Sequence, residues 1–170
     1  MKKIILLIAL TVISMVTNAQ SFFDSLEDMD GVDMVVVNQD MFELLSKFGP
    51  DKMKDNEAMQ IFTMIKDLKK LKVFSTDDAI IADKMETMAN SAIKKHNLTE
   101  LMRIKEDDSR VKIYVKSTKN KEYVSEVLMF IKGIDKQTKG ISKSMIVSLT
   151  GNIDINKLSA LADTFTEKNK

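Results

Sequence analysis

The chain has 170 residues, contains no cysteine and carries a formal net charge of +1 at pH 7. The lack of cysteine excludes disulfides, thiol nucleophiles and thiolate-ligated metal sites. The near balance of charge gives no electrostatic case for nucleic acid or an anionic membrane as a partner.

Residues 1–19 have the pattern of a secretory signal peptide. A pair of lysines precedes an apolar stretch over residues 4–16, and small or polar residues follow up to Ala19. The apolar stretch is shorter than the about 20 residues that a helix needs to cross a bilayer. We therefore predict cleavage after Ala19 and an exported mature chain that starts at Gln20 and has no transmembrane helix. An uncleaved helical anchor is the alternative.

The mature chain should be periplasmic or secreted. It should not be a lipoprotein, because Gln20 occupies the place where a lipid-anchored protein needs a cysteine. Cleavage removes Lys2 and Lys3 and leaves 24 basic against 25 acidic side chains. We interpret residues 20–32 as an acidic, flexible leader and residues 33–167 as one folded domain, which is long enough for a substantial core.

A weak calcium-like spacing at Asp28, Asp30 and Asp33 spans the end of the leader and the first residue of the domain. A calcium loop of the EF-hand type also needs a bidentate glutamate further along the chain, and none stands at the right distance. We therefore prefer a solvated linker to a calcium site.

Hydrophobic periodicity predicts that the domain starts with a strand, two helices and a strand. A β-branched run at residues 34–37 is typical of a buried strand, and a helix should follow over residues 39–48. A second helix is expected over residues 56–68 and a second strand over residues 71–75. The two strands are candidates for a parallel crossover pair. The expected buried stripes are Met41, Leu44, Leu45 and Phe48 in the first helix, and Ala58, Ile61, Phe62, Ile65 and Leu68 in the second.

A longer helix should run from capping residues 76–78 to about His96, with Asn97 as its C-cap. Its expected buried stripe is Ile81, Met85, Met88, Ala92 and Ile93. The period then becomes strand-like, which predicts strands over residues 98–106, 110–116, 121–133 and 141–151. The first three should form an antiparallel meander. A closing helix is expected over residues 154–165.

This order of elements predicts an α+β fold, with a mixed, largely antiparallel sheet of about six strands and helices packed on one face. Charge suggests one register within the sheet. Placing Lys112 opposite Glu126 sets Lys116 opposite Glu122 and aligns the apolar faces, whereas a slip by one residue brings charge onto the core face. We therefore predict a cross-strand pair of Lys112 and Glu126.

Few side chains suggest catalysis. His96 is the only histidine, no nucleophile motif surrounds it, and a place at the end of a helix explains it. Glu126 stands in an otherwise apolar strand, where a catalytic carboxylate is the alternative to a partner for Lys112. We expect no catalytic residue, no metal and no cofactor.

Two further patterns have simple structural explanations. Met85 with Met88, and more loosely Met59 with Met64, allow a copper(I) site as an alternative, but all four lie on apolar stripes where thioethers fill gaps in a core. A basic hairpin is interleaved with acidic side chains, so we interpret it as a solvated face of the sheet and not as a nucleic-acid platform. Its basic residues are Lys112, Lys116, Lys119 and Lys121.

Several segments together resemble family 4252 of the domains of unknown function. They are VVVNQDMFELL (35–45), NLTELMRIKEDDSRVKIYVKS (97–117), SEVLMFIKG (125–133) and IVSLTGNIDINKLSAL (146–161). The resemblance covers about Val32 to Ala162 and rests on the apolar strands and the strand-Gly-x-Ile-Asp ending. It implies a small exported bacterial protein and carries over no activity. Many members look like lipoproteins, whereas this chain lacks the cysteine.

We expect a monomeric, non-enzymatic protein of the cell envelope that binds a protein or a ligand. One alternative is a regulatory partner in envelope stress or sigma-factor-linked signalling, which the resemblance implies because genes of the family can lie near sigma-factor genes. Another is a carboxylate-dependent hydrolase of envelope polymers, with Glu126 as its acid.

Overall fold

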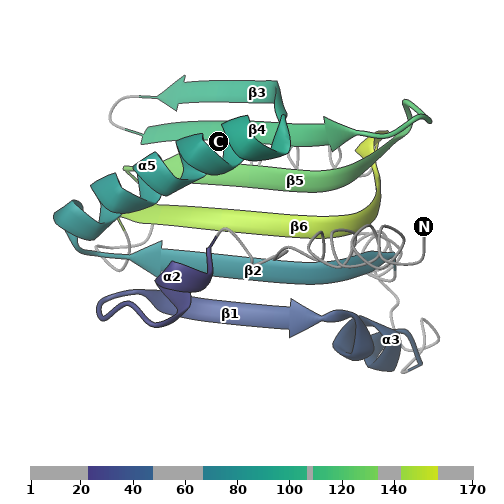
Figure 1. Cartoon of the computed structure of the whole chain (residues 1–170), viewed down its shortest axis with the longest axis horizontal. Helices are drawn as coiled ribbons and strands as arrows, with labels where there is room; N and C mark the ends of the chain where they lie inside the picture. Colours follow the sequence, from purple (N-terminus) through teal and green to yellow (C-terminus); the bar gives the residue numbers. More distant parts are fainter. Residues whose placement is uncertain (1–22, 48–66, 107–108, 134–142, 157–170) are drawn as a thin grey trace, which may run out of the picture.

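The computed structural model describes residues 23–47, 67–106, 109–133 and 143–156 (Figure 1). They form one antiparallel sheet of six strands in the order β1-β2-β6-β5-β4-β3, together with helices, which confirms the α+β fold. The strands are β1 (Asp33–Asn38), β2 (Leu68–Thr76), β3 (Thr99–Glu106), β4 (Ser109–Ser117), β5 (Tyr123–Lys132) and β6 (Ser144–Asp154). The helices are α2 (Asp24–Glu27), α3 (Gln39–Lys47) and α5 (Ala79–His96).

The first two strands run antiparallel, so the parallel crossover is wrong for this pair. Asn38, the last residue of β1, lies opposite Lys70 near the start of β2. The chain thus re-enters the sheet at the end where it left, and this reverses its direction. Leu68, which we expected at the end of a helix, is the buried first residue of β2.

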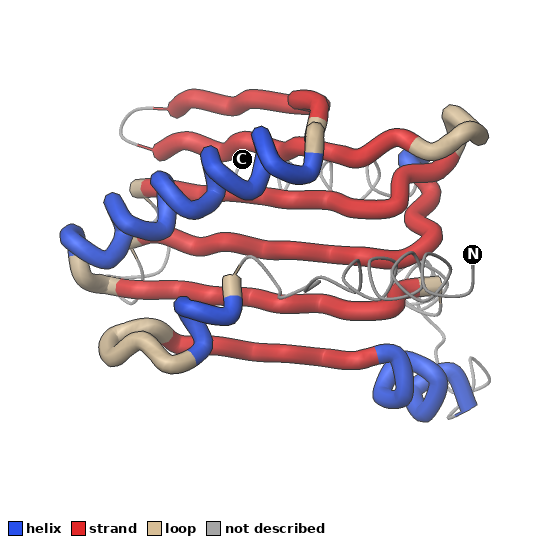
Figure 2. Tube along the Cα trace, in the orientation of Figure 1, coloured by secondary structure: helices blue, strands red, loops and turns tan. Residues whose placement is uncertain are grey.

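The long helix α5 has the ends that its sequence predicts. The carboxylate of Asp78 accepts hydrogen bonds from the backbone amides of Ile80 (2.7 Å) and Ile81 (3.0 Å). At the other end Asn97 adopts the left-handed conformation with φ of 54°, which suits asparagine at a C-cap. Between these caps α5 lies diagonally across the sheet, on the same side as α2 (Figure 2).

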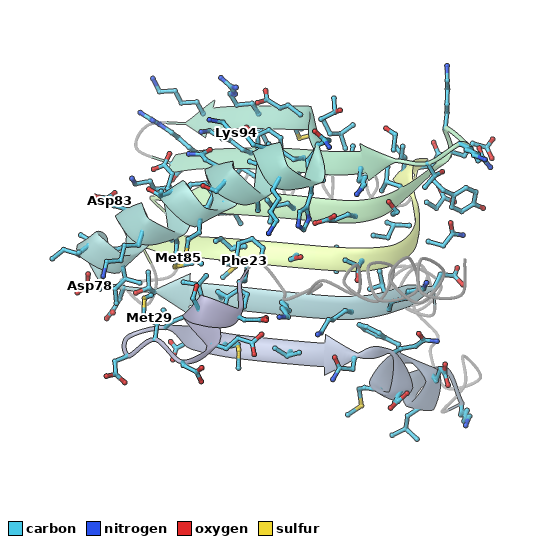
Figure 3. The ribbon with its side chains drawn as sticks, viewed as in Figure 1. Phe23, Met29, Asp78, Asp83, Met85 and Lys94 are labelled. Carbon is cyan, nitrogen blue, oxygen red and sulfur yellow. The ribbon has the colours of Figure 1, made fainter. Side chains whose placement is uncertain are left out.

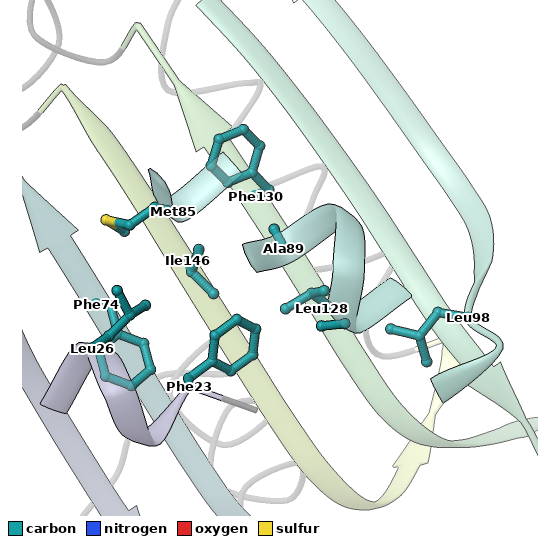
Figure 4. Close-up of a cluster of buried hydrophobic side chains, with 10 residues drawn as sticks. Phe23, Leu26, Phe74, Met85, Ala89, Leu98, Leu128, Phe130 and Ile146 are labelled. Carbon is teal, nitrogen blue, oxygen red and sulfur yellow. The ribbon is translucent and has the colours of Figure 1, made fainter. Parts of the chain in front are cut away.

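The core beneath α5 and α2 joins helix and strand side chains (Figure 4). Its buried members are Phe23, Leu26, Phe74, Met85, Ala89, Ala92, Leu98, Leu128, Phe130 and Ile146. Met85 is fully buried and Met88 packs against the cluster, so these two methionines have the core position that their spacing predicts. Small alanines on α5 allow the helix to approach the strands closely, while Ile81 and Ile93 lie at the margin.

Residues 23–32 differ from the flexible leader that we expected. Phe23 and Leu26 are core residues, and the ring centroids of Phe23 and Phe74 are 5.8 Å apart. Figure 3 shows Phe23, Met29 and Met85 on the same side of the sheet. Apolar side chains recur here at every third position, interleaved with acidic ones that face solvent. The described fold therefore begins at Phe23, ten residues before the boundary that we expected at residue 33.

A second cluster of buried side chains lies on the other face of the sheet. Its members are Phe42, Leu68, Ile113, Val115, Val124, Val127 and Ile153. Helix α3 buries Phe42, whereas Met41 and Leu44 are exposed. The buried stripe that we expected for this helix is therefore wrong for those two residues.

Several expected features lie outside the described residues. They are the signal peptide over residues 1–19, almost all of the helix over residues 56–68, and most of the closing helix over residues 154–165. No helix in the part of the chain that the structure describes is long and apolar enough to cross a membrane.

Candidate functional site

His96 and Glu126, the two polar residues considered for catalysis from the sequence, are in contact in the structure. Nδ1 of His96, at the end of α5, is 2.7 Å from Oε1 of Glu126 on β5. The side chain of Glu126 is 14% exposed and that of His96 is 33% exposed. A carboxylate held this far from water against an imidazole forms a charge-assisted hydrogen bond when the imidazole is protonated.

A β-bulge places Glu126 at the end of the helix. Val124 and Glu126 have consecutive partners on β4, Ser117 and Lys116, so Ser125 is the extra residue in β5. A bulge re-aims the side chains that follow it. It sets Glu126 on the face that α5 covers, between Lys116 on β4 and Thr150 on β6.

The expected pair of Lys112 and Glu126 is wrong. Lys112 lies opposite Phe130, and Lys116 lies opposite Glu126. From Arg110 to Lys116 the true register differs from the expected one by an even number of residues, so these side chains keep their faces. Beyond the bulge the shift is odd, and Val124 lies on the same face as Val127. The alignment of apolar faces excluded odd slips and could not distinguish between even ones.

Lys112 and Lys132 instead tie the first half of α5 to the sheet. Nζ of Lys132 is 2.8 Å from Oδ1 of Asp83 and 2.8 Å from Oε2 of Glu86, while Nζ of Lys112 is 3.9 Å from Oε1 of Glu86. The hydrogen bonds that Lys132 donates to Asp83 and then to Glu86 raise the pKa of Lys132 above its usual value. These bonds therefore fix the helix over β4 and β5 without forming a reactive centre.

A further polar cluster lies on the outer strand β3. Arg103 donates to Glu100 at 2.6 Å, and the hydroxyl of Tyr114 donates to the same carboxylate at 3.1 Å. The hydrogen bond from Arg103 lowers the pKa of Glu100, whereas partial burial raises the pKa of Tyr114. All three side chains have satisfied partners on an accessible surface, which is typical of a solvated sheet face.

The polar contacts described above offer few groups for metal binding or acid–base chemistry. Among the described residues no group of three or more His, Asp or Glu side chains is arranged to hold a metal ion. No buried side-chain nitrogen or oxygen in this part of the chain lacks a hydrogen-bond partner. The contact of His96 with Glu126 can orient an imidazole and share a proton, so it remains the one candidate here for acid–base chemistry.

An apolar surface at one edge of the sheet is the second candidate site. Six large apolar side chains of the described residues are exposed, and four belong to β1 or to α3, which follows it directly. We call these four the β1–α3 patch: Met34 (42% exposed), Val35 (56%), Met41 (49%) and Leu44 (46%). The other two, Ile80 and Leu101, lie on α5 and β3. Met34 and Val35 are consecutive in β1, so their side chains point to opposite faces and the apolar exposure lies along this edge of the sheet, not on one face. Exposed apolar side chains close together in sequence at an edge are a mark of binding surfaces.

The two edge strands of the sheet have different sequences. The outer strand β3 reads TELMRIKE and carries charges along its length, whereas β1 reads DMVVVN and carries charge only at Asp33. Charged side chains on an edge strand oppose pairing with another strand, and a run of valines favours it. The sequence alone did not reveal this difference, because strand order decides which strands are edges.

The comparisons with known proteins give one match. A family model described as Domain of unknown function (DUF4252) matches residues 23–161 of the chain. No curated protein matches, and no solved structure matches. The matched region begins at Phe23, which agrees with the packing of α2 into the core.

Proposed function

The chain belongs to the DUF4252 family, and from this premise we propose that it is an exported protein of the cell envelope that works by binding another protein. The N-terminal pattern of paired lysines, a short apolar stretch and Ala19 supports export. The contact surface is the β1–α3 patch. The partner is a protein, since an exposed edge strand offers backbone hydrogen bonds that only another polypeptide satisfies in series.

The observation that carries the proposal is the exposure of Val35. A valine that is 56% exposed, beside Met34 at 42%, in an edge strand without a lysine or proline is costly for a protein in water. Such exposure is retained where a partner covers it. The nearby Met41 and Leu44 of α3 extend the apolar surface beyond the strand.

Photo-cross-linking in living cells tests the proposal. A photoreactive amino acid replaces Val35 in one variant and Leu101, 44% exposed on β3, in the matched control. We expect an adduct with one identified protein at position 35 and none at position 101. Equal adducts at both positions, or none at position 35, would contradict a binding role for the patch. Fractionation of the same cells tests export, because the proposal places the chain in the envelope or outside the cell.

A regulatory role in envelope stress signalling is a special case of this proposal. It requires the protein captured at position 35 to belong to a signalling system. Capture of a structural envelope protein would exclude this special case and leave the wider proposal in place.

The contact between His96 and Glu126 is the observation that favours a second candidate, a hydrolase of envelope polymers. A glutamate in contact with an imidazole can pass a proton to or from that ring. Glycan and peptide turnover by the natural chain and by Glu126→Gln decides this alternative. Turnover that disappears in a folded Glu126→Gln variant would replace the binding proposal with an enzymatic one.

A further inference from the structure

We infer that the protein bound at the β1–α3 patch is a second copy of this chain, held by antiparallel pairing of the two β1 strands. The inference rests on the proposed function, which makes the patch a binding surface. It names the partner and the geometry, and it replaces the monomer expected from the sequence with a dimer built on one twelve-stranded sheet.

The first step concerns the backbone hydrogen-bonding groups of the edge strand β1. On its inner side β1 pairs with β2 over all six of its residues. None of the other described strands pairs with its outer side, because β1 is the first strand in the sheet order. Alternate amide and carbonyl groups of a strand point to opposite sides, so the outer side presents hydrogen-bonding groups to an incoming strand.

The second step is symmetry. A two-fold axis perpendicular to the sheet pairs β1 with β1 in antiparallel fashion and keeps the faces of both sheets on the same sides. Residues directly opposite each other share a face, so a residue pairs only with itself or with one an even number of positions away. The axis that passes nearest the middle of β1 therefore lies at Val35 or at Val36.

Charge decides between these two positions. With the axis at Val35, the carboxylate of Asp33 lies opposite Val37 of the partner subunit. With the axis at Val36, Asp33 lies beyond the paired residues, next to the start of the partner subunit's α3, and Val35 lies opposite Val37 of the partner subunit. In the second arrangement Met34 lies opposite Asn38 of the partner subunit, so an apolar side chain meets a neutral amide and not a carboxylate. The inferred axis therefore passes through Val36.

The third step explains why the partner is the same chain. The exposed strand is nearly uncharged, with Asp33 at one end and Asn38 at the other, so two copies meet without opposed like charges. The opposite edge, β3, carries Glu100, Arg103 and Lys105, which disfavour pairing there. One open edge per chain gives a closed dimer, whereas two would give fibres.

Analytical ultracentrifugation tests self-association. The chain, expressed with its own N-terminal segment and purified, should sediment as a dimer at micromolar concentration. Val35→Lys should raise the dissociation constant at least about tenfold, because lysine is the side chain that natural edge strands use against pairing. Leu101→Lys, a matched change at the other edge, should leave the dimer unchanged. A natural chain that sediments as a monomer overturns the inference.

Cysteine scanning tests the strand pairing itself, since the chain contains no cysteine of its own. Under mild oxidation Val36→Cys should give a disulfide-linked dimer, because the axis brings the two residues opposite each other at a Cα separation of about 4.5–5.5 Å. Leu101→Cys should stay unlinked. A cross-link at Val35→Cys in place of Val36→Cys would overturn the register and keep the paired strands. A dimer that is linked at neither position would overturn strand pairing.

The inference and the proposed function fail in different ways. If the chain is a monomer and position 35 captures a different envelope protein, the proposed function stands and the second copy is excluded. If the chain is a monomer and position 35 captures nothing, both fail. A dimer that is lost in Val35→Lys supports both.

Discussion

Nζ of Lys72 lies 3.1 Å from Oδ1 of Asp24, and this contact joins the middle of β2 to α2. The same ammonium also contacts the carboxylate of Glu27. The side chain of Lys72 is only 6% exposed, whereas those of Asp24 and Glu27 are 37% and 32% exposed. A buried cation is therefore neutralised from the accessible side by the segment that precedes β1.

This asymmetry predicts unequal effects of mutation. Removing both carboxylates, by Asp24→Asn with Glu27→Gln, should cost about 2–3 kcal/mol of unfolding free energy, which is less than the 3–5 kcal/mol typical of fully buried pairs. Lys72→Met should change stability by about 1 kcal/mol or less, since an apolar side chain of similar length can replace a buried ion. Urea titration measures both. A larger loss in Lys72→Met than in the double variant would refute this account.

The contact of His96 with Glu126 should appear as a coupling energy. In a double-mutant cycle of His96→Gln and Glu126→Gln, we expect a coupling of about 0.5–1.5 kcal/mol, the usual size for one intramolecular hydrogen bond. A matched cycle that replaces Glu126→Gln with Glu122→Gln should show none, because Glu122 is exposed in the turn before β5. Equal coupling in the two cycles would mean that long-range charge, and not the contact, is measured.

The cap of α5 predicts a pH dependence. Hydrogen bonds from the amides of Ile81 and Ile80 hold the pKa of Asp78 below its usual value of 3.8. A lowered pKa contributes stability above the unfolded value, and this stability is lost as the pH falls through the folded one. Asp78→Ala should therefore lower the melting temperature by several degrees at pH 7. The difference in melting temperature between the natural chain and Asp78→Ala should shrink below about pH 4. Asp78→Ser should restore most of the melting temperature, because serine also caps helices. A difference that is constant down to pH 2 would contradict the role of the charge.

Two glycines should differ in their tolerance of a methyl group. A Cβ at Gly151, where φ is +150°, would lie 2.5 Å from the carbonyl oxygen of Asp67 and 2.8 Å from Cα of Leu68. A Cβ at Gly31 would meet only the flexible end of Ile81, at 2.8 Å. Gly151→Ala should cost about 3 kcal/mol or more, and Gly31→Ala about 1–2 kcal/mol. Chemical denaturation measures both losses. A larger loss of unfolding free energy in Gly31→Ala than in Gly151→Ala would show that the backbone around Gly151 adjusts more easily than its close contacts indicate.

The proposed export predicts a defined N-terminus. Intact-mass spectrometry of the protein recovered outside the cytoplasm should give a chain that begins at Gln20. Ala19→Arg places a large charged residue at the cleavage point and should block processing. If the natural chain and Ala19→Arg are both recovered at full length from the cytoplasm, the signal-peptide interpretation is ruled out.

Local signals in the sequence predicted much of the fold. The helix caps at Asp78 and Asn97 and the change to a two-residue period after Leu98 depend only on neighbouring residues. They located α5 and the four strands that follow to within a few residues. The leader over residues 20–32 was expected to be flexible because it is rich in acidic residues. The apolar side chains at every third position, which enter the core, were too few to indicate a helix or a strand.

The candidate site depended on distant parts of the chain, and its contacts could not be predicted. Glu126 reaches His96 through a bulge at Ser125, and the order of apolar and polar residues does not show where an extra residue interrupts the pairing of strands. The exposure of Val35 depends on strand order, which places β1 at an edge. His96 is the only histidine of the sequence and Glu126 stands in an otherwise apolar strand. Their contact depends on the fold and is not visible in either local pattern.

The position of β6 determines when the sheet can be completed. The last of the described strands to leave the ribosome, β6, lies between β2 and β5. The pair formed by β1 and β2 therefore stays separate from the meander of β3, β4 and β5 until residues 144–154 have been synthesised. Contacts between segments so far apart in sequence form late and slowly. A nascent chain that ends before Ser144 therefore holds two incomplete sheets and no stable domain. In the export that we propose, this delay would keep the polypeptide unfolded enough to pass through a translocation channel.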